Sequence, residues 1–357
     1  MRAAAPLAEP DIGRVLIVDD SAVARAVLAR VIDASDRLSV AGSVPTAAAA
    51  LAFLHVGRVD LMILDIQMPG IDGLTALPEL LAAGRGAKVL IVSAAAGSGA
   101  TATIQALALG AADTLVKPMP GERSRGFEAE LIGKLERLLA PVERLVAQPA
   151  APGPAASVTL GSTTDAFDVV AIGASTGGIH ALSHLLRALP AGMSTPILVT
   201  QHLPASFMPY FAAQLAVLAN RPCDVATDRL RLRPGRIVVA PGDAHLRCVS
   251  LGDGTGAIRL SHDAVAGGCM PSVDPMFESI ADCFGARALA VVLSGMGRDG
   301  LEGARRLHAA GGCVVAQDEA SSVVWGMPGA IAAAGLAAAL LDPQALGALI
   351  ASRKRPL

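Results

Sequence analysis

Residues 168–178 read Asp-Val-Val-Ala-Ile-Gly-Ala-Ser-Thr-Gly-Gly, an apolar run that ends in a glycine-rich turn around a single serine. The apolar run predicts a buried strand, and the segment after Gly178 has the pattern of a helix. Glycines on both sides of Ser175 permit a sharp turn without a Cβ clash, which presents the serine hydroxyl at the edge of a sheet. The stretch therefore predicts an α/β fold with a nucleophile. The spacing G-x-S-x-x-G also differs from a dinucleotide-binding fingerprint by only one glycine, so this alternative stays open here.

The same alternation of strand and helix continues along the chain in both directions. Short apolar runs, with helix-like segments between several of them, lie at 15–18, 61–64, 89–92, 197–200, 236–240 and 288–293. Strands that alternate with helices predict parallel, doubly wound sheets. Residues 148–164 interrupt this pattern, because they are rich in Pro, Ala, Gly, Ser and Thr and lack apolar periodicity, as flexible connections do. We therefore expect two doubly wound parallel-sheet domains, at 13–144 and 165–352, with a flexible linker at 145–164.

The composition agrees with two buried cores and excludes several classes of protein. The chain has 357 residues, of which 53% are hydrophobic and 17% are charged, and a length of about 150 residues per domain favours two domains. The formal net charge of -2, with scattered basic residues, argues against nucleic-acid binding. Five cysteines without a C-x-x-C pair argue against a disulfide framework and a zinc cluster. No apolar run reaches the roughly 18 residues that span a bilayer, so we expect a cytoplasmic protein without membrane insertion.

Polar residues stand where the strand-like runs of the first domain end. Asp19 and Asp20 follow the first run, and Asp65 follows another. Because open parallel sheets place their sites at the carboxyl ends of strands, we expect these acids to cluster. Clustered carboxylates repel one another unless a hard divalent cation such as Mg²⁺ neutralises them. Ser93 and Lys117 end two further runs, and a carboxylate, a metal, a hydroxyl and a lysine together make a phosphoryl-accepting site.

The second domain contains partners for Ser175. A serine nucleophile needs a general base, because its hydroxyl is mostly protonated near neutral pH. His202 closes the next strand-like run along the chain, and Asp299 follows a later one within a glycine-rich loop. Neighbouring strands would bring these side chains to one sheet edge, where the acid would orient the histidine. A dinucleotide site would instead need an acid after the second strand to hold the ribose hydroxyls, and the Thr-Gln-His sequence there offers none.

The other histidines have simpler interpretations. His180 and His184 lie four residues apart on a predicted helix, but Ala181 stands where a zinc-protease helix has glutamate. We therefore interpret this pair as surface or packing residues. The sequence identifies no acid-base partner for the remaining histidines and leaves them outside the site: His55, His245, His262 and His308.

Taken together, the motifs of both domains resemble those of a known family. In the second domain they lie at 171–178, 200–202, 240–245, 271–274, 295–300 and 317–328. These motifs resemble the chemotaxis protein-glutamate methylesterase family, CheB. In the first domain, residues 18–21, 65–73, Ser93 and Lys117-Pro118 resemble the receiver domain of two-component response regulators. The resemblance covers nearly the whole chain and implies a receiver-like domain followed by a Rossmann-like methylesterase domain.

The receiver resemblance implies that a chemotaxis histidine kinase phosphorylates the first domain. It assigns Asp65 as the phosphoacceptor, Asp19, Asp20, Asp65 and the backbone carbonyl of Gln67 as Mg²⁺ ligands, and Ser93 and Lys117 as phosphoryl-binding residues. One position departs from the family pattern, since Thr114 stands three residues before the lysine, where receivers usually carry an aromatic switch residue. The rotating-ring readout of phosphorylation is therefore not expected in its usual form.

The methylesterase resemblance implies a reaction for the second domain. Ser175 would attack the γ-methyl ester of glutamyl residues on methyl-accepting chemoreceptors, while His202 takes and returns the proton and Asp299 orients the imidazole. The amides of Thr176 and Met296 would stabilise the oxyanion. The same acyl-enzyme route would deamidate receptor glutamines, without any cofactor for the esterase reaction. The family also implies that the unphosphorylated receiver covers the esterase cleft and that phosphorylation loosens this cover.

Two other functions and one departure qualify this prediction. The second domain would instead be a catalytically quiet binding module, controlled by the phosphorylated receiver, if Ser175 and His202 lay far beyond ~3.2 Å from each other. A DNA-binding response regulator is disfavoured by the lack of a basic recognition helix. Cys269 and Met270 stand where the family commonly has histidine and arginine, which leaves the preferred substrate sequence open.

Overall fold

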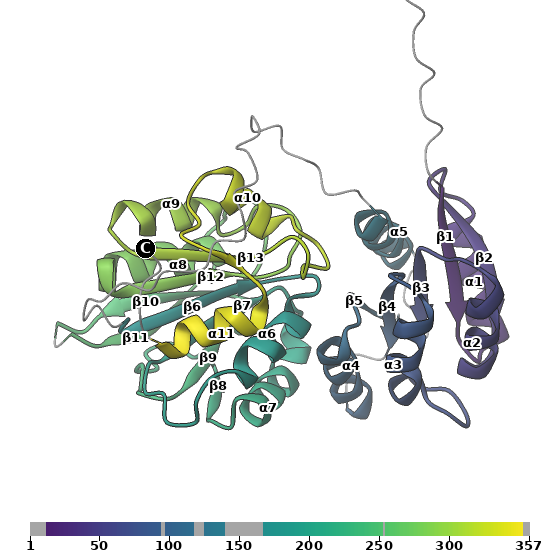
Figure 1. Cartoon of the computed structure of the whole chain (residues 1–357), viewed down its shortest axis with the longest axis horizontal. Helices are drawn as coiled ribbons and strands as arrows, with labels where there is room; N and C mark the ends of the chain where they lie inside the picture. Colours follow the sequence, from purple (N-terminus) through teal and green to yellow (C-terminus); the bar gives the residue numbers. More distant parts are fainter. Residues whose placement is uncertain (1–11, 94–96, 118–124, 140–166, 253, 353–357) are drawn as a thin grey trace, which may run out of the picture. The chain divides into compact units, whose positions relative to one another are not determined.

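The computed structural model describes residues 12–93, 97–117, 125–139, 167–252 and 254–352, and they form two compact units. Each unit is built around a parallel sheet with helices on both faces (Figure 1). The predicted fold class is confirmed. The linker expected at 145–164 lies outside the described residues. Within the described residues, no helix is both long enough and apolar enough to cross a bilayer.

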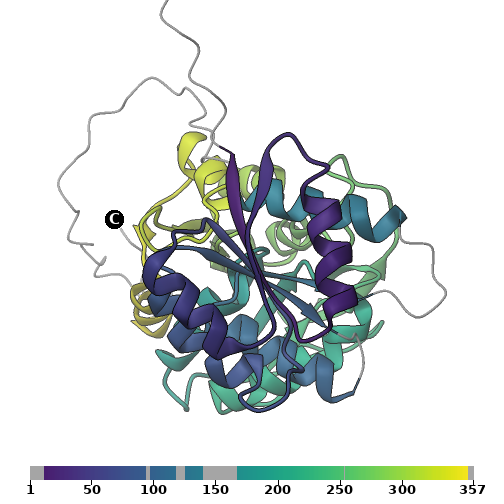
Figure 2. The same ribbon diagram turned by 90° about the vertical axis from the view of Figure 1, so that its right-hand side faces the viewer.

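The first unit carries a five-stranded parallel sheet in the order β2-β1-β3-β4-β5. Its strands are β1 (Gly13–Val18), β2 (Leu38–Val44), β3 (Leu61–Leu64), β4 (Lys88–Ser93) and β5 (Asp113–Val116). The helices between and after them are α1 (Ala22–Ile32), α2 (Ala47–Val56), α3 (Gly73–Ala83), α4 (Ser98–Leu109) and α5 (Arg125–Leu139). Figure 2 shows α1 and α5 beside each other on one side of this sheet, and α2 packs against α3.

The sequence of the first unit places its acids at one edge. The apolar residues of β1 and β3 are almost fully buried, as expected of central parallel strands covered on both faces. Capping residues then start helices soon after the strands end: the Ser21 hydroxyl accepts from the amide of Ala24, and the Asp72 carboxylate accepts from that of Thr75. From β1 the chain moves to β2 on one side and later to β3 on the other. The crevice at this reversal lies at the carboxyl ends of β1 and β3.

The second unit carries a seven-stranded parallel sheet in the order β14-β13-β12-β6-β7-β9-β8. Its strands are β6 (Val169–Ala174), β7 (Ile197–Gln201), β8 (Cys223–Val225), β9 (Ile237–Val239), β12 (Ala288–Val292), β13 (Cys313–Gln317) and β14 (Leu340–Leu341). Its helices are α6 (Gly178–Arg187), α7 (Met208–Ala219), α8 (Val273–Phe284), α9 (Leu301–Ala309), α10 (Met327–Ala333) and α11 (Pro343–Ser352), with short 3₁₀ turns at Ala205–Phe207 and Gly285–Arg287. Helices α8, α9 and α10 form one packed group, and α6, α7 and α11 form another (Figure 1).

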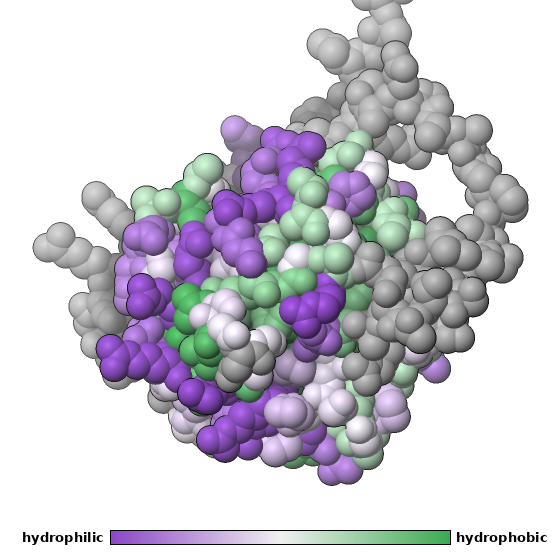
Figure 3. Space-filling view, turned by 90° about the vertical axis from the view of Figure 1, so that its left-hand side faces the viewer, coloured by the Kyte–Doolittle hydropathy of each residue, from purple (hydrophilic) through white to green (hydrophobic). Residues whose placement is uncertain are grey.

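An antiparallel hairpin adds to the predicted architecture. Strands β10 (His245–Ser250) and β11 (Gly256–Ser261) form a separate two-stranded sheet, with one isolated bridge from β11 to Arg231, and β10 packs against α8. The inner side chains of the hairpin join the core of this face, as Leu246 and Ile258 do. The hairpin therefore supports the face of α8 that the sheet does not cover. On the face shown in Figure 3, hydrophilic residues surround a smaller hydrophobic area.

Three neighbouring strands bring the predicted catalytic residues to one edge. Strand β6 pairs with β12 on one side and with β7 on the other, all parallel. The loops after these strands carry Ser175, His202 and Asp299. The turn after β6 needs glycine at Gly177, because its φ is +74° and an added Cβ would lie 2.5 Å from the Cβ of Val323. The sheet order therefore explains why residues distant in the sequence meet.

Candidate active site

The structure places the three predicted catalytic residues in one hydrogen-bonded chain. His202 Nδ1 lies 3.1 Å from the Ser175 hydroxyl oxygen, and His202 Nε2 lies 2.8 Å from Asp299 Oδ2. The side chain of His202 is 19% exposed and that of Asp299 is 6% exposed. The serine-to-histidine separation is within the ~3.2 Å reach of a general base, so the geometry expected of a quiet binding module is not found.

The acid fixes which nitrogen of His202 carries the proton. An ionised carboxylate can only accept hydrogen bonds, so Nε2 donates to Asp299. In the neutral ring the other nitrogen, Nδ1, is then the acceptor that faces the Ser175 hydroxyl. This tautomer is the one that can take a proton from serine.

Asp299 is held by donors from the start of α8 and from its own loop. Its carboxylate accepts from the Ser272 hydroxyl at 2.6 Å, the Val273 amide at 2.8 Å and the Gly300 amide at 3.0 Å. Burial alone would raise the pKa of Asp299, but the hydrogen bond and charge of His202 and these further donors lower the pKa to about 2. The amides at a helix start also favour negative charge. The Asp299 carboxyl is therefore ionised near neutral pH.

His245, for which the sequence alone identifies no partner, lies directly behind the donors that hold Asp299. Its side chain is fully buried, its Nδ1 accepts from the Ser272 amide at 2.9 Å, and its Nε2 faces the Asp263 carbonyl at 2.9 Å. Because Nδ1 must accept and the carbonyl needs a donor, His245 is a neutral ring with its proton on Nε2. His245 therefore fixes the backbone of Ser272, which in turn holds Asp299.

Close backbone contacts shape the turn that carries the nucleophile. The Ser175 amide donates to the Ser294 carbonyl at 3.0 Å, and Gln201 Nε2 donates to the Ser175 carbonyl at 2.9 Å. An added Cβ at Gly295 would lie 2.9 Å from the Cβ of Ser175, so the two loops approach closely only because this residue is glycine. The orientation of Ser175 is thus fixed from both neighbouring strands.

The predicted oxyanion donors lie in these same two loops. Thr176 follows the nucleophile, and Met296 follows Gly295 in the loop after β12. The Ser294 hydroxyl ties the loops together by donating to the Thr176 carbonyl at 2.8 Å. The roles of the Thr176 and Met296 amides stay predictions.

The two departures from the family pattern lie between β11 and α8. Met270 is 41% exposed, and Cys269 is half-buried beside His202 and Asp299. Neither side chain supplies the positive charge of the arginine that the resemblance leads us to expect in this segment.

The acids of the first unit meet at the carboxyl edge of its sheet. One carboxylate oxygen each of Asp19, Asp20 and Asp65 lies within 4.8 Å of the others. Lys117 Nζ lies 2.6 Å from Asp65 Oδ2 and 3.1 Å from Asp19 Oδ2. Burial raises the pKa of Asp65 above its usual value, although the hydrogen bond and charge of Lys117 oppose this. A donor set made only of oxygens fits Mg²⁺.

The other residues predicted for this edge are also nearby. The Gln67 amide donates to Asp65 Oδ1 at 3.2 Å. Ser93 is the buried last residue of β4, and its carbonyl accepts from the Lys117 amide at 2.9 Å. Thr114 is buried, and its hydroxyl has no hydrogen-bond partner among the described residues. Pro118 lies outside the described residues.

His180 and His184 share one face of α6, as their spacing predicted. Their rings meet edge to face with centroids 4.6 Å apart. Neither belongs to a possible metal-binding group among the described residues. Burial, together with the neighbouring His180, lowers the pKa of His184, in agreement with a packing role.

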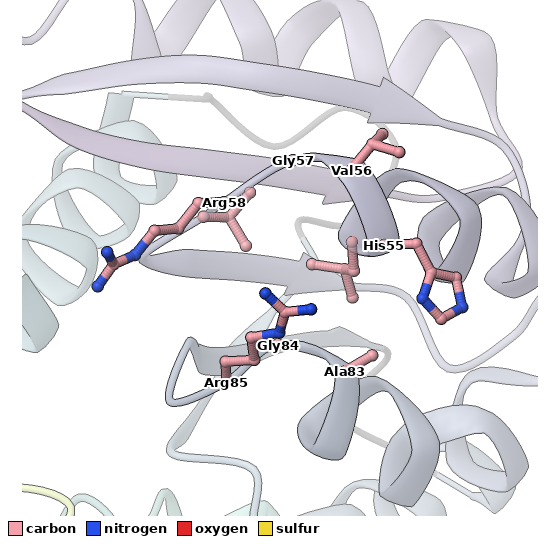
Figure 4. A pocket seen from close by; sticks show the side chains of 9 residues that line it. His55, Val56, Gly57, Arg58, Ala83, Gly84 and Arg85 are labelled. Atoms are coloured by element: carbon pink, nitrogen blue, oxygen red, sulfur yellow. The ribbon is translucent and has the colours of Figure 1, made fainter.

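A surface hollow of about 280 Å³ in the first unit is not part of either site (Figure 4). It is lined by the ends of α2 and α3 and the residues that follow them, including His55, Arg58 and Arg85. Since β3 and β4 begin just after these residues, the hollow lies at the amino edge of the sheet, opposite Asp65. Its lining contains no acid and no nucleophile.

Comparisons with known proteins agree with this arrangement. Residues 170–350 match the family described as CheB methylesterase, and residues 15–125 match the response regulator receiver domain. The chain is 40% identical over 354 residues to protein-glutamate methylesterase/protein-glutamine glutaminase 1 of Paramagnetospirillum magneticum, covering 92% of each chain. It is 41% identical over 344 residues to the corresponding protein 2 of Caulobacter vibrioides, covering 96% of this chain and 99% of that one. The solved CheB methylesterase catalytic domain of Thermotoga maritima is 31% identical and aligns with a TM-score of 0.51 over 52% of this chain and 98% of its own.

Proposed function

The chain belongs to the CheB methylesterase family, with a response-regulator receiver domain ahead of the catalytic domain, and from this premise we propose that Ser175, His202 and Asp299 carry its reaction. The protein is a protein-glutamate methylesterase and protein-glutamine glutaminase that acts in phosphorylation-regulated demethylation of chemoreceptors. The observation that carries the proposed mechanism is the chain of 3.1 Å and 2.8 Å contacts from the serine through the histidine to the acid.

The acylation step uses the tautomer that Asp299 imposes. His202 Nδ1 takes the hydroxyl proton of Ser175 as the serine oxygen attacks the ester carbonyl. Asp299, ionised and fixed by the start of α8, stabilises the imidazolium that forms. When the tetrahedral intermediate collapses, the proton on Nδ1 passes to the leaving group, which departs as methanol from an ester or as ammonia from a glutamine amide.

Deacylation repeats these proton transfers with water. His202 Nδ1 takes a proton from water as its oxygen attacks the acyl-enzyme, and then returns the proton to the Ser175 oxygen. The product is a receptor glutamate. The amides of Thr176 and Met296 stabilise the oxyanion in both steps, and losing one such donor costs about 3 kcal/mol of transition-state stabilisation. Their placement in the two loops joined by Ser294 supports this assignment.

The receiver supplies the regulation. A histidine kinase phosphorylates Asp65, while Lys117 and Ser93 hold the phosphoryl group at the sheet edge. The oxygens of Asp19, Asp20 and Asp65, with the Gln67 carbonyl, suit Mg²⁺, which when bound neutralises charge on the transferred group. The close contact between Lys117 and Asp65 supports these roles.

Methanol release tests the proposed function directly. Membranes with methylated chemoreceptors are incubated with the full chain, with and without a small phosphodonor. We expect methanol release that increases with the phosphodonor. Methanol at the background level in both conditions would contradict the proposal.

Replacing Asp65 with alanine should separate regulation from catalysis. We expect D65A to keep the basal rate but to lose stimulation by the phosphodonor, because the phosphoacceptor is absent while Ser175 is untouched. The matched control is D36A, which removes an exposed carboxylate near the start of β2, at the opposite edge of the sheet. The ratio of stimulated to basal methanol release is the measurement. Stimulation that survives in D65A would show that another residue accepts the phosphoryl group.

Two substitutions of His245 test its positioning role. His245→Leu leaves the buried Ser272 amide without an acceptor and loosens Asp299, so we expect kcat to fall about 10- to 100-fold with KM little changed. His245→Asn keeps an acceptor where Nδ1 stood and should recover most of that loss. Both variants lose the bond to the Asp263 carbonyl, so their difference isolates the contact with Ser272. Equal activity of the two variants at equal thermal stability would show that His245 only fills space.

A further inference from the structure

Cys269 is a polar neighbour of His202 and Asp299 that the esterase reaction does not use. One ligand atom each of His202, Cys269 and Asp299 lies within 4.8 Å of the others. Apart from the acids of the receiver, this is the only such group among the described residues. The cysteine lies in the segment between β11 and α8, and its side chain is half-buried.

The three donors are of different kinds. They are an imidazole nitrogen, a thiol sulfur and a carboxylate oxygen. This set suits Zn²⁺, which is commonly bound by three protein ligands and a water at sites open to solvent. It does not suit Mg²⁺ or Ca²⁺, which prefer oxygen ligands. The group therefore differs in metal preference from the acidic site of the receiver.

His202 would use the nitrogen that already faces the acid. Nδ1 faces the Ser175 hydroxyl, whereas Nε2 lies 2.8 Å from Asp299 Oδ2. Zinc bonds of ~2.0–2.3 Å require ligand atoms about 3–4 Å apart, so the metal would replace the proton between these two atoms after a small separation. Bonds form from zinc to the nitrogen, oxygen and sulfur; the thiol proton leaves to solvent, and the ring proton moves from Nε2 to Nδ1, so that the ligand is a neutral imidazole.

The loop can bring Cys269 into place. An added Cβ at Gly267 or Gly268 would meet no atom within 4 Å, so this part of the loop is not packed against the protein. The thiol donates a long contact of 3.7 Å to the Gly267 carbonyl within the same loop. Asp299, by contrast, is fixed by the amides of α8 and can serve as the rigid ligand.

We infer that His202, Cys269 and Asp299 form a zinc-binding site that switches off the esterase. A zinc ion on Nε2 takes the oxygen of Asp299 that orients the imidazole and holds the ring in the tautomer with its proton on Nδ1. Nδ1 then has no lone pair to accept the proton of Ser175. Inhibition rests on the proposed function, whereas zinc binding itself does not.

The test uses the full chain, reduced with a phosphine and kept in excess Mg²⁺ so that the acidic receiver site is saturated. Zn²⁺ is titrated while methanol release is followed. In parallel, Co²⁺ is added in place of Zn²⁺, because a sulfur-to-cobalt charge-transfer band reports thiolate ligation independently of activity. The variant is Cys269→Ser, and the matched control is Cys223→Ser, which removes another half-buried thiol on β8.

We expect one Zn²⁺ per chain to inhibit the unchanged protein and the Cys223→Ser control alike. In Cys269→Ser, the Zn²⁺ concentration that halves activity should rise about 100-fold. Loss of a residue that only hydrogen-bonds to a metal ligand already lowers metal affinity by up to about 100-fold, and Cys269 is itself a ligand. The cobalt band should be present in the first two proteins and absent from Cys269→Ser and His202→Ala. Equal zinc sensitivity of Cys269→Ser, or no sulfur-to-cobalt band in the unchanged protein, would overturn the site. If the metal-free chain released no methanol, the proposed function would fail, and the cobalt spectrum would still decide the metal site.

Discussion

Ser175→Ala should reduce the rate of methanol release from methylated receptors by about six orders of magnitude, the loss that removal of the nucleophile causes in serine proteases. His202 would still face the empty position, but no oxygen would be present to form the acyl-enzyme. The residual rate would come from the oxyanion donors and from substrate binding. Turnover is best compared as kcat at saturating receptor, in the presence of phosphodonor.

The fold should survive this change. Ser175 is only half-buried, and the backbone bonds of its turn to Ser294 and Gln201 do not involve the hydroxyl. Ser250→Ala, which removes an exposed hydroxyl at the end of β10, is the matched control and should keep full activity. A Ser175→Ala variant with normal turnover and an unchanged melting temperature would exclude the acyl-enzyme mechanism.

Asp299→Asn should have the second largest effect, a fall in kcat of about 10⁴-fold, as the corresponding change causes in a protease triad. If the new amide NH₂ faces His202, it donates to Nε2 and moves the ring proton to Nδ1, where no acceptor is left for the serine. If the NH₂ points the other way, it faces the backbone N–H of Gly300, and two donors then meet without an acceptor. In either orientation one backbone N–H loses its acceptor, because Val273 and Gly300 donate to different oxygens.

The asparagine variant should therefore also be less stable, by about 1–3 kcal/mol. Asp282→Asn is the matched control, since Asp282 lies on the same helix, α8, and its exposed carboxylate accepts from Arg306 rather than from His202. We expect the control to keep its activity. Measurement of both kcat and the free energy of unfolding separates the two effects. Full activity of Asp299→Asn would mean that the acid does not control the tautomer of His202.

Most of the residues that could be predicted from sequence share one property: each follows directly on an apolar strand or opens the loop after it. Asp65 and Ser175 are of this kind, because a parallel sheet gathers its strand ends at one edge whatever the chain separation. Asp299 lies further into its loop, but glycines around it marked the loop as a tight one. The rule that strands alternate with helices thus predicted both sheets and the residues that meet at the carboxyl edge of each, whose roles stay predictions.

The residues that sequence reasoning missed depend on contacts outside that rule. His245 begins an antiparallel strand, and Ser272 precedes α8, so neither lies at the end of a sheet strand. Only the packing of β10 on α8 brings the imidazole to the Ser272 amide. The motifs at 240–245 and 271–274 contained both residues, but the sequence offered no geometry to connect them. The proximity of Cys269 to the triad likewise depends on the path of one loop.

The first turn of α8 is capped by a residue from another segment of the chain. Ser272 stands at the capping position but does not cap the helix; its hydroxyl donates to Asp299, and the carboxylate of that residue accepts from the first helical amide instead. The proposed catalytic acid is thus also the N-terminal cap of a helix more than twenty residues away in the sequence. The capping of α8 and the placement of Asp299 consequently depend on the same contact, so a chain with a capped α8 already has its proposed acid in place before any substrate arrives.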